Sequence, residues 1–218
     1  MSDANTRPDS ERGFASHRRA LRRHKEEAVP FQITPLPGRL YEPLFKLDDE
    51  ELRTRSARRV LASSKPGYPC RVSLAEAEIG ETLILVNHET VPFGPYRATH
   101  AIYVRENARP AVLEPDELPD VLRTRTYSVR TFDSDWSMRC GAIVPADSLR
   151  DHLTGQFEDR ETAIIHIHNA GAGCFCGGGD SSVMIHDHRS GAAPWLNRLA
   201  GFSARSAAGT GLPVSGRP

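Results

Sequence analysis

Short strand-like segments, most of them adjacent along the chain, constrain the fold of this sequence more than any other feature. They alternate apolar and polar side chains or are apolar throughout, and turn residues separate them, as is typical of β-strands. The candidates are residues 31–34, 68–74, 83–87, 101–105, 127–132, 140–144 and 163–168. Because little helix separates them, consecutive strands are expected to pair as antiparallel neighbours.

Helical periodicity is confined to residues 48–62, 115–122 and 147–157. The acidic run 48–51 suits the start of a helix, and Asp147 is a candidate N-cap for the last of the three. The predicted fold is therefore α+β, a single compact domain with a mostly antiparallel sheet of about six strands and about three helices.

Composition divides the chain into three parts. Residues 1–30 are polar and basic and are predicted to be a disordered extension, and residues 31–180 are expected to form the domain. The strand at 163–168 is predicted to be the last of the series, because a glycine run at 177–180 marks a change in composition. Residues 181–218 are predicted to be a low-complexity, disordered tail.

Charge and cysteine content narrow the class of protein. The 28 basic residues equal the 28 acidic ones, so the net charge is zero and no nucleic-acid partner is expected. A basic block at 17–25 could contact nucleic acid or an anionic membrane surface, but it is interpreted as a solvated, partly helical arm. The chain has no apolar leader and no run long enough to cross a bilayer, and its four cysteines are unevenly spread. We therefore expect a soluble, cytoplasmic protein with reduced thiols and no membrane partner.

Residues 163–175, A-I-I-H-I-H-N-A-G-A-G-C-F, hold the densest group of reactive side chains. In a β-strand, His166 and His168 lie on the same face because side chains alternate. The glycine loop that follows brings Asn169 and Cys174 near the end of that strand.

Metal binding is the first chemistry this pattern allows. A His-x-His pair supplies two imidazoles, Cys174 or Cys176 could add a thiolate, and His186 and His188 form a second pair. The chain lacks C-x-x-C and H-E-x-x-H spacing, however. Histidines paired with backbone or carboxylate groups are the competing interpretation, so neither a metal site nor a cofactor is predicted.

Nucleophilic catalysis is the second possibility. A cysteine beside imidazoles has the ingredients of a thiolate–imidazolium pair, and Cys174 is the first candidate. Cys70, next to Arg71, is the second. The alternative is that both cysteines are small buried hydrophobic residues.

Anion recognition is the third possibility. Arg71, Arg97 and Arg105 lie in or beside strand-like segments, where a guanidinium can hold a carboxylate or phosphate in bidentate fashion. The loop at 171–173 could add backbone N–H donors. Structural pairing with the glutamates at positions 76, 78 and 81 is an equally good account of these arginines.

Several motifs resemble a bacterial family of uncharacterised proteins, domain of unknown function 1203. They are K-P-G-Y-P-C-R-V-S-L-A-E-A-E at 65–78, F-K-L-D-D-E-E-L at 45–52, Y-R-A-T-H-A-I-Y-V-R-E at 96–106 and I-H-I-H-N-A-G-A-G-C-F at 165–175. The resemblance implies one compact domain and supplies no activity. After Phe175 the chain departs from the family pattern, because C-G-G-G-D and the low-complexity tail replace a short basic–acidic ending.

Together these features indicate a small-molecule-binding protein or small enzyme that recognises an anionic ligand. The predicted catalytic residues are His166, His168 and Cys174, and the predicted ligand-binding residues are Cys70, Arg71 and Asn169. The alternatives are a non-catalytic partner-binding module and a transition-metal-binding protein. An enzyme should bring Arg71, His168 and Cys174 to one cavity, whereas a module should bury them separately.

Overall fold

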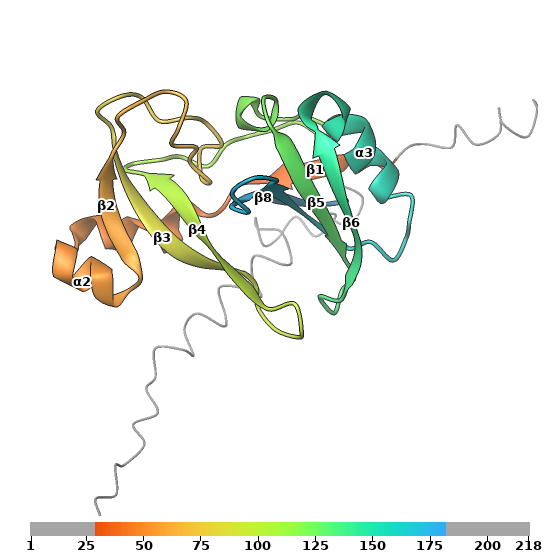
Figure 1. Cartoon of the computed structure of the whole chain (residues 1–218), viewed down its shortest axis with the longest axis horizontal. Helices are drawn as coiled ribbons and strands as arrows, with labels where there is room; N and C mark the ends of the chain where they lie inside the picture. The colour runs from red at the N-terminus through yellow and green to blue at the C-terminus, as the bar shows by residue number, and fades with distance from the viewer. Residues whose placement is uncertain (1–28, 182–218) are drawn as a thin grey trace, which may run out of the picture.

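Eight strands in two antiparallel sheets form the framework of the computed structural model, which describes residues 29–181 (Figure 1). The five-stranded sheet has the order β1-β8-β7-β5-β6 and the three-stranded sheet the order β2-β3-β4. The strands are β1 Phe31–Thr34, β2 Ala57–Leu61, β3 Thr82–Val91, β4 Ala98–Arg105, β5 Thr126–Phe132, β6 Met138–Pro145, β7 Ile164–Asn169 and β8 Phe175–Ser181. The helices are α2 Asp49–Thr54 and α3 Leu149–Gln156, with 3-10 turns η1 Gly38–Leu40, η2 Glu42–Lys46, η3 Asp120–Leu122 and η4 Ala146–Ser148.

The five-stranded sheet lies between the three-stranded sheet and α3. Ile165 and Ile167 of β7 join Leu149 and Leu153 of α3 in one buried cluster. Ile164 points to the opposite face of β7 from Ile165 and Ile167, and it belongs to a second cluster with residues of the three-stranded sheet. The two faces of β7 thus serve two cores, as the period-2 alternation of a strand requires.

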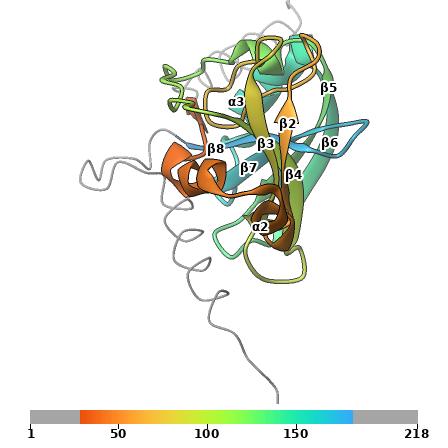
Figure 2. The same ribbon diagram turned by 90° about the vertical axis from the view of Figure 1, so that its left-hand side faces the viewer.

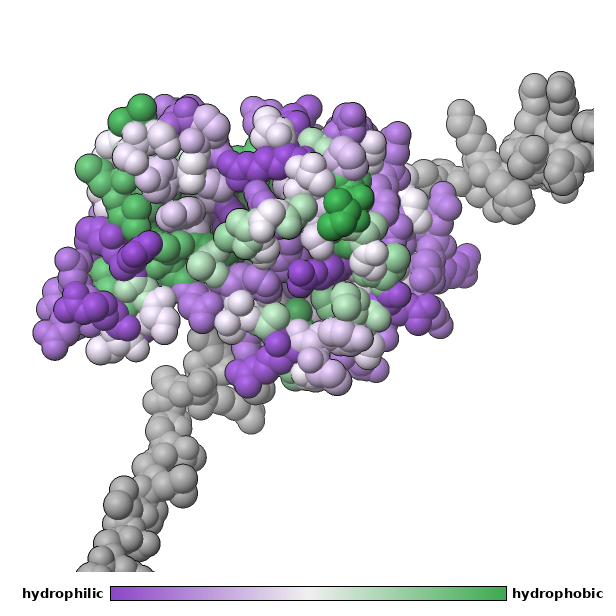
Figure 3. Space-filling model, in the orientation of Figure 1, coloured by the Kyte–Doolittle hydropathy of each residue, from purple (hydrophilic) through white to green (hydrophobic). Residues whose placement is uncertain are grey.

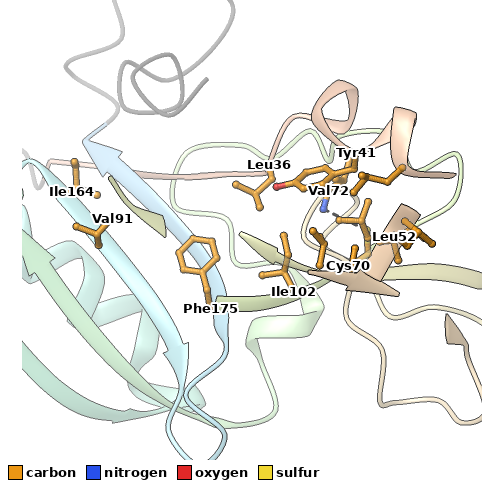
Figure 4. Close-up of a cluster of buried hydrophobic side chains, with 14 of the residues drawn as sticks. Leu36, Tyr41, Leu52, Cys70, Val72, Val91, Ile102, Ile164 and Phe175 are labelled. Atoms are coloured by element: carbon orange, nitrogen blue, oxygen red, sulfur yellow. Dashed lines mark hydrogen bonds between the residues drawn. The ribbon is translucent and has the colours of Figure 1, made fainter. Parts of the chain in front are cut away.

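Figure 4 shows the core between the two sheets. Phe175 of β8 and Ile102 of β4 reach into this cluster from opposite sheets, and Cys70 and Val72 pack beside them. All four side chains are at most 1% exposed. Packing of the sheets against each other therefore buries the turn that contains Cys70.

The surface is mixed in character. Hydrophilic residues cover most of the face in Figure 3, and apolar groups interrupt them chiefly over the half that carries the three-stranded sheet. Within residues 29–181 no helix has the length and apolar character needed to span a membrane.

The helix predicted over 48–62 is much shorter in the structure. A capping box between Asp48 and Glu51 begins α2 as the acidic run suggests, but the helix ends at Thr54. Ser56 then takes a positive φ of 51°, and β2 follows at once. Ala57 and Val60, whose spacing also fits a helix, are paired with Val86 and Leu83 of β3. The prediction failed because a short apolar pattern suits both structures.

Two other predicted elements are also different. The segment 68–74 is a tight turn joined to its surroundings by isolated bridges, Pro69 with Glu76 and Cys70 with Tyr103. Leu74 there has a positive φ of 48°, which prevents a continuous strand. The segment 115–122 forms only the short turn η3, because Asp116 has a positive φ of 61°.

The strand at 163–168 is not the last one, contrary to the prediction. The glycine run forms β8, which pairs with β1 on one side and β7 on the other. A Cβ at Gly179 would lie 2.4 Å from the carbonyl oxygen of Gln32, so no larger residue fits there. Glycine, normally unfavourable in strands, is required by the close approach of the neighbouring backbones.

The remaining predicted elements are confirmed within small boundary shifts. They are the strands β1, β3, β4, β5, β6 and β7 and the helix α3. The structure has more strands and fewer helices than expected, although the α+β class broadly fits. The predicted N-terminal arm and C-terminal tail lie outside the described residues.

Candidate functional site

Two groups of reactive side chains lie on either side of Phe175. The first, here called the imidazole cluster, consists of His88, His100, His166 and His168. The second, the thiol–arginine cluster, consists of Cys70, Arg71, Arg125, Cys174 and Cys176. The Phe175 carbonyl accepts a hydrogen bond from Arg71, and its ring contacts His166 and His168 at centroid distances of 5.1 and 5.7 Å.

Strand pairing positions the imidazole cluster. His88 and His100 are direct partners on β3 and β4. His166 and His168 lie on one face of β7, as predicted, and the ring of His168 is 4.7 Å from that of His100 and 5.9 Å from that of His166. The cluster therefore joins the two sheets.

Burial makes these imidazoles poor bases. His166 is fully buried among the rings of Phe132 and Trp136, and desolvation lowers its pKa well below the usual value. Desolvation also lowers the pKa of His168 to about 3, with a further contribution from nearby Arg130, and that of His88 to about 4. Since the pKa of His100 is lowered by the same cause, all four are neutral near pH 7.

Hydrogen bonds define the tautomers of two of the rings. His168 Nδ1 donates to the Gly173 carbonyl over 3.2 Å, because a carbonyl can only accept. Thr90 donates its hydroxyl proton to the Ala98 carbonyl, so His100 Nδ1 donates to Thr90 Oγ1 over 2.8 Å. Each ring is left with a lone pair on Nε2, and that of His168 is buried with no hydrogen-bond partner among residues 29–181.

This arrangement does not support the metal-binding hypothesis with a site of three ligands. In the part of the chain that the structure describes, no group of three or more His, Cys, Asp or Glu side chains is placed to hold a metal ion. The second pair, His186 and His188, lies outside the described residues.

Arg71 is the centre of the thiol–arginine cluster. It is only 5% exposed, and its Nε donates to the Phe175 carbonyl over 2.5 Å while Nη1 donates to the Pro69 carbonyl. Desolvation lowers its pKa, whereas the nearby thiols of Cys176, Cys174 and Cys70 act in the opposite direction. Within residues 29–181 no carboxylate forms an ion pair with it. Arg71 is therefore a buried cation that lacks a described counter-ion.

The three thiols near Arg71 differ in environment. Cys70 is fully buried, and its Sγ accepts from the backbone N–H groups of Val72, Ser73 and Arg105, each over 3.4 Å. Cys176 is buried, which raises the pKa of its thiol, although Arg71 and Arg125 oppose that change. Cys174 is partly exposed and makes only a weak contact with the Ala172 carbonyl, 3.9 Å away. Cys174 is thus the accessible thiol of the cluster.

A second guanidinium lies close to Arg71. Arg125 is near enough to lower the pKa of Arg71, and it pairs with Glu76 over 3.3 Å. Glu76 also accepts from the N–H groups of Gly67 and Tyr68, both over 2.9 Å. Glu76 thus pairs with Arg125 and not with Arg71, and the two guanidiniums give the cluster a positive excess.

The backbone N–H groups of the glycine loop 171–173 bond within the loop. They are therefore not available to an anionic ligand, contrary to the suggestion from the sequence. Asn169 Oδ1 accepts from the N–H groups of Gly171 and Ala172, over 3.0 and 3.1 Å. The Gly173 N–H donates to the Asn169 carbonyl over 2.8 Å. These three N–H groups are used within the loop, so Asn169 shapes the loop.

The sequence-predicted residues do not all meet at one place. Arg71 lies with Cys70 and Cys174, His168 holds the loop through Gly173, and His166 is enclosed by aromatic rings. None of the six predicted residues lines the cavity of about 520 Å³ or the cavity of about 310 Å³ that lie among the described residues. Arg97 and Arg105 pair with Glu89 and Glu81, over 2.8 and 2.5 Å, which favours the structural account of these two arginines.

Sequence reasoning missed His88, His100 and Arg125. Opposed strands bring the two histidines to the sheet interface, and only a correct β3–β4 register would have placed them together. Arg125 had a weaker signal, because it lies two residues before the predicted strand at 127–132.

Comparison with known proteins agrees with the resemblance in the motifs. Residues 67–177 match the family described as "Protein of unknown function (DUF1203)". No curated protein and no solved structure matches the chain. Because the match extends over just over half of the sequence and includes the turn of Cys70 and Arg71, the β7 histidines and Cys174, this chain belongs to the DUF1203 family.

Proposed function

We propose that this protein binds a small anionic ligand at Arg71 and Arg125, beside the Cys174 thiol, as a small-molecule-binding protein or a small enzyme. The observation that carries the proposal is the buried Arg71 guanidinium, which has no carboxylate partner within the described residues. Arg125 adds a second positive charge at the same place.

The energetics of burial support this proposal. Removing a charged group from water costs several kcal/mol unless an opposite charge and hydrogen bonds compensate it. Two backbone carbonyls accept from Arg71, but a guanidinium has further N–H donors. A ligand carboxylate or phosphate would supply the missing negative charge and accept those donors in the bidentate geometry that arginine favours.

Cys174 supplies the reactive group of the same site. The thiol of Cys174 is partly exposed and lies near Arg71, and cysteine is a common protein nucleophile. In this proposal Arg71 and Arg125 hold the anionic group and Cys174 acts as the nucleophile. Asn169 and His168 keep the loop in place through their bonds to Gly171, Ala172 and Gly173.

The assignment of His166 and His168 as acid–base groups has less support than the role of Cys174. Neutral imidazoles have the lone pair that a general base needs. However, the ring of Phe175 lies against both, while Arg71 binds the backbone of the same residue. We therefore propose a positioning role for His168 and place the protein in the cytoplasm, where its free thiols would stay reduced.

A pair of alkylating reagents tests the proposal. Iodoacetate is an anion and iodoacetamide is neutral, so recruitment of anions beside Cys174 raises the ratio of its two alkylation rates. Exposed Cys140 on β6 is the internal reference in the same protein. We expect a ratio several times higher at Cys174 than at Cys140, measured by mass spectrometry of the two peptides, and a lower ratio in the presence of inorganic phosphate.

Arg125→Gln should bring the Cys174 ratio close to that of Cys140. Arg123→Gln, which removes an exposed guanidinium just before β5, is the matched control and should leave the ratio high. Equal ratios at the two cysteines of the unmodified chain would overturn the proposal. So would a preference that persists unchanged in Arg125→Gln.

A further inference from the structure

The larger of these two cavities has a lining distinct from the residues of the thiol–arginine cluster. It has a volume of about 520 Å³ and is bounded by η1 and η2 on one side and by the end of β4 with the following loop on the other. Figure 2 shows the orange turns of η1 and η2 below the green loop that follows β4. Ligand-binding pockets commonly span about 300 to 1,000 Å³, so this volume suits a small molecule.

Positive charge dominates the lining of this cavity. Arg39, Arg105 and Arg109 contribute three guanidiniums, and Glu42 contributes the carboxylate. Arg105 is already paired with Glu81 over 2.5 Å. Arg39 and Arg109 form no ion pair within residues 29–181, so both remain available to a ligand.

Apolar groups form the rest of the wall. Phe45 and Val104 face the cavity together with Ala108, and prolines 37 and 110 stand at its edges. The wall is closely packed behind: a Cβ on Gly38 would lie 3.3 Å from the Ala108 carbonyl oxygen. Backbone hydrogen bonds attach both sides to the turn at 71–73, Leu36 N–H to the Arg71 carbonyl over 2.9 Å and Ala111 N–H to the Val72 carbonyl over 3.0 Å. The cavity is therefore held open by ordered backbone on both sides.

We propose that this cavity binds a small organic anion, a carboxylate or phosphate monoester carried on a flat apolar body. Arg39 and Arg109 bind the anionic group, Phe45 and Val104 contact the apolar body, and Arg105 stays fixed by Glu81. This site shares no lining residue with the thiol–arginine cluster and does not depend on the function proposed above.

Phenyl phosphate is a suitable probe, because it combines both halves of the expected ligand. It is titrated into the full chain and followed by NMR of the backbone amides, with calorimetry for the affinity. Inorganic phosphate represents the anionic group alone and benzyl alcohol represents the apolar body alone, and each is titrated separately. We expect saturable shifts centred on residues 104–109, and binding at least tenfold tighter than for either half alone.

Two substitutions test the assignment. Arg39→Gln and Arg109→Gln should each weaken phenyl phosphate binding by roughly tenfold, since each removes one charge-assisted contact from an exposed residue. Arg58→Gln is the control, because Arg58 is exposed on β2 and lines the smaller cavity. It should leave the affinity unchanged.

Two outcomes overturn the proposal. One is the absence of saturable shifts at 104–109, and the other is an equal loss of affinity in the Arg58→Gln control. The iodoacetate preference of Cys174 should persist in Arg109→Gln. Failure at this cavity is thereby distinguishable from failure of the proposed function.

Discussion

His100 and His168 face each other across the interface between the two sheets, with ring centroids 4.7 Å apart. Each ring uses Nδ1–H for a fixed hydrogen bond, to Thr90 Oγ1 and to the Gly173 carbonyl respectively. His100 comes from the three-stranded sheet and His168 from the five-stranded one. Protonation of this pair would place like charges in contact within the interface, next to Arg130.

Acid should therefore destabilise the protein well above the pH at which carboxylates titrate. The pKa of His88 is lowered from 6.5 to about 4 and that of His168 to about 3, so below pH 6.5 the unfolded chain binds more protons than the folded one. The contribution of these histidines to stability should be complete above about pH 6.5 and should fall towards pH 3, at up to about 1.4 kcal/mol per pH unit for each such histidine.

Urea unfolding between about pH 5 and pH 8 checks this prediction. His168→Gln should reduce the slope of stability against pH. The same substitution at half-exposed His152 of α3 should reduce it less, because fewer neighbouring groups act on that ring. Equal stability at both ends of the pH range would contradict the prediction.

Gly179→Ala should destabilise the five-stranded sheet. The new Cβ would lie 2.4 Å from the carbonyl oxygen of Gln32, a backbone atom that moves only if β1 moves. We expect a loss of about 2–4 kcal/mol in the free energy of unfolding. Gly177→Ala is the control, since its Cβ would make an ordinary 3.9 Å contact with Ile33. If both variants unfold at the same urea concentration, the close approach is not what requires glycine at 179.

The glycine run of β8 is an element that the sequence pattern does not predict. Strands such as β3 and β7 have strong apolar patterns and were predicted, whereas β8 was missed because its residues are unfavourable in strands generally. Gly179 is required by the backbone of β1, which is distant in sequence, and Gly178 lies close to the backbone of the adjacent strand β7. Likewise the shared face of His166 and His168 follows from strand periodicity, but their contact with His100 depends on how two sheets pack.

Asp180 should respond to pH in the opposite direction from the histidines. It is buried, its Oδ1 has no hydrogen-bond partner within the described residues, and desolvation raises its pKa from 3.8 to about 6. A raised carboxyl pKa means that the folded state holds the proton more tightly, so stability is lost as the pH rises from about 4 through 6.

Asp180→Asn should therefore stabilise the protein above pH 6, by about 2–3 kcal/mol at pH 8, and change little at pH 4. Thermal unfolding at the two pH values measures this difference. Exposed Asp135→Asn serves as the control and should have a small effect at both. A stability loss in Asp180→Asn at pH 8 would show that the buried carboxylate has a favourable role.

Cys70 should prove to be a structural residue and not a nucleophile. Its Sγ accepts from three backbone N–H groups, those of Val72, Ser73 and Arg105, and it is 0% exposed. Cys70→Ala removes the acceptor for all three and leaves a small void, so we expect a loss of about 2–3 kcal/mol. Cys70→Ser keeps an acceptor oxygen and should lose less. In the folded protein iodoacetamide should label exposed Cys140 while Cys70 stays unlabelled, and labelling of both at similar rates would return Cys70 to the list of candidate nucleophiles.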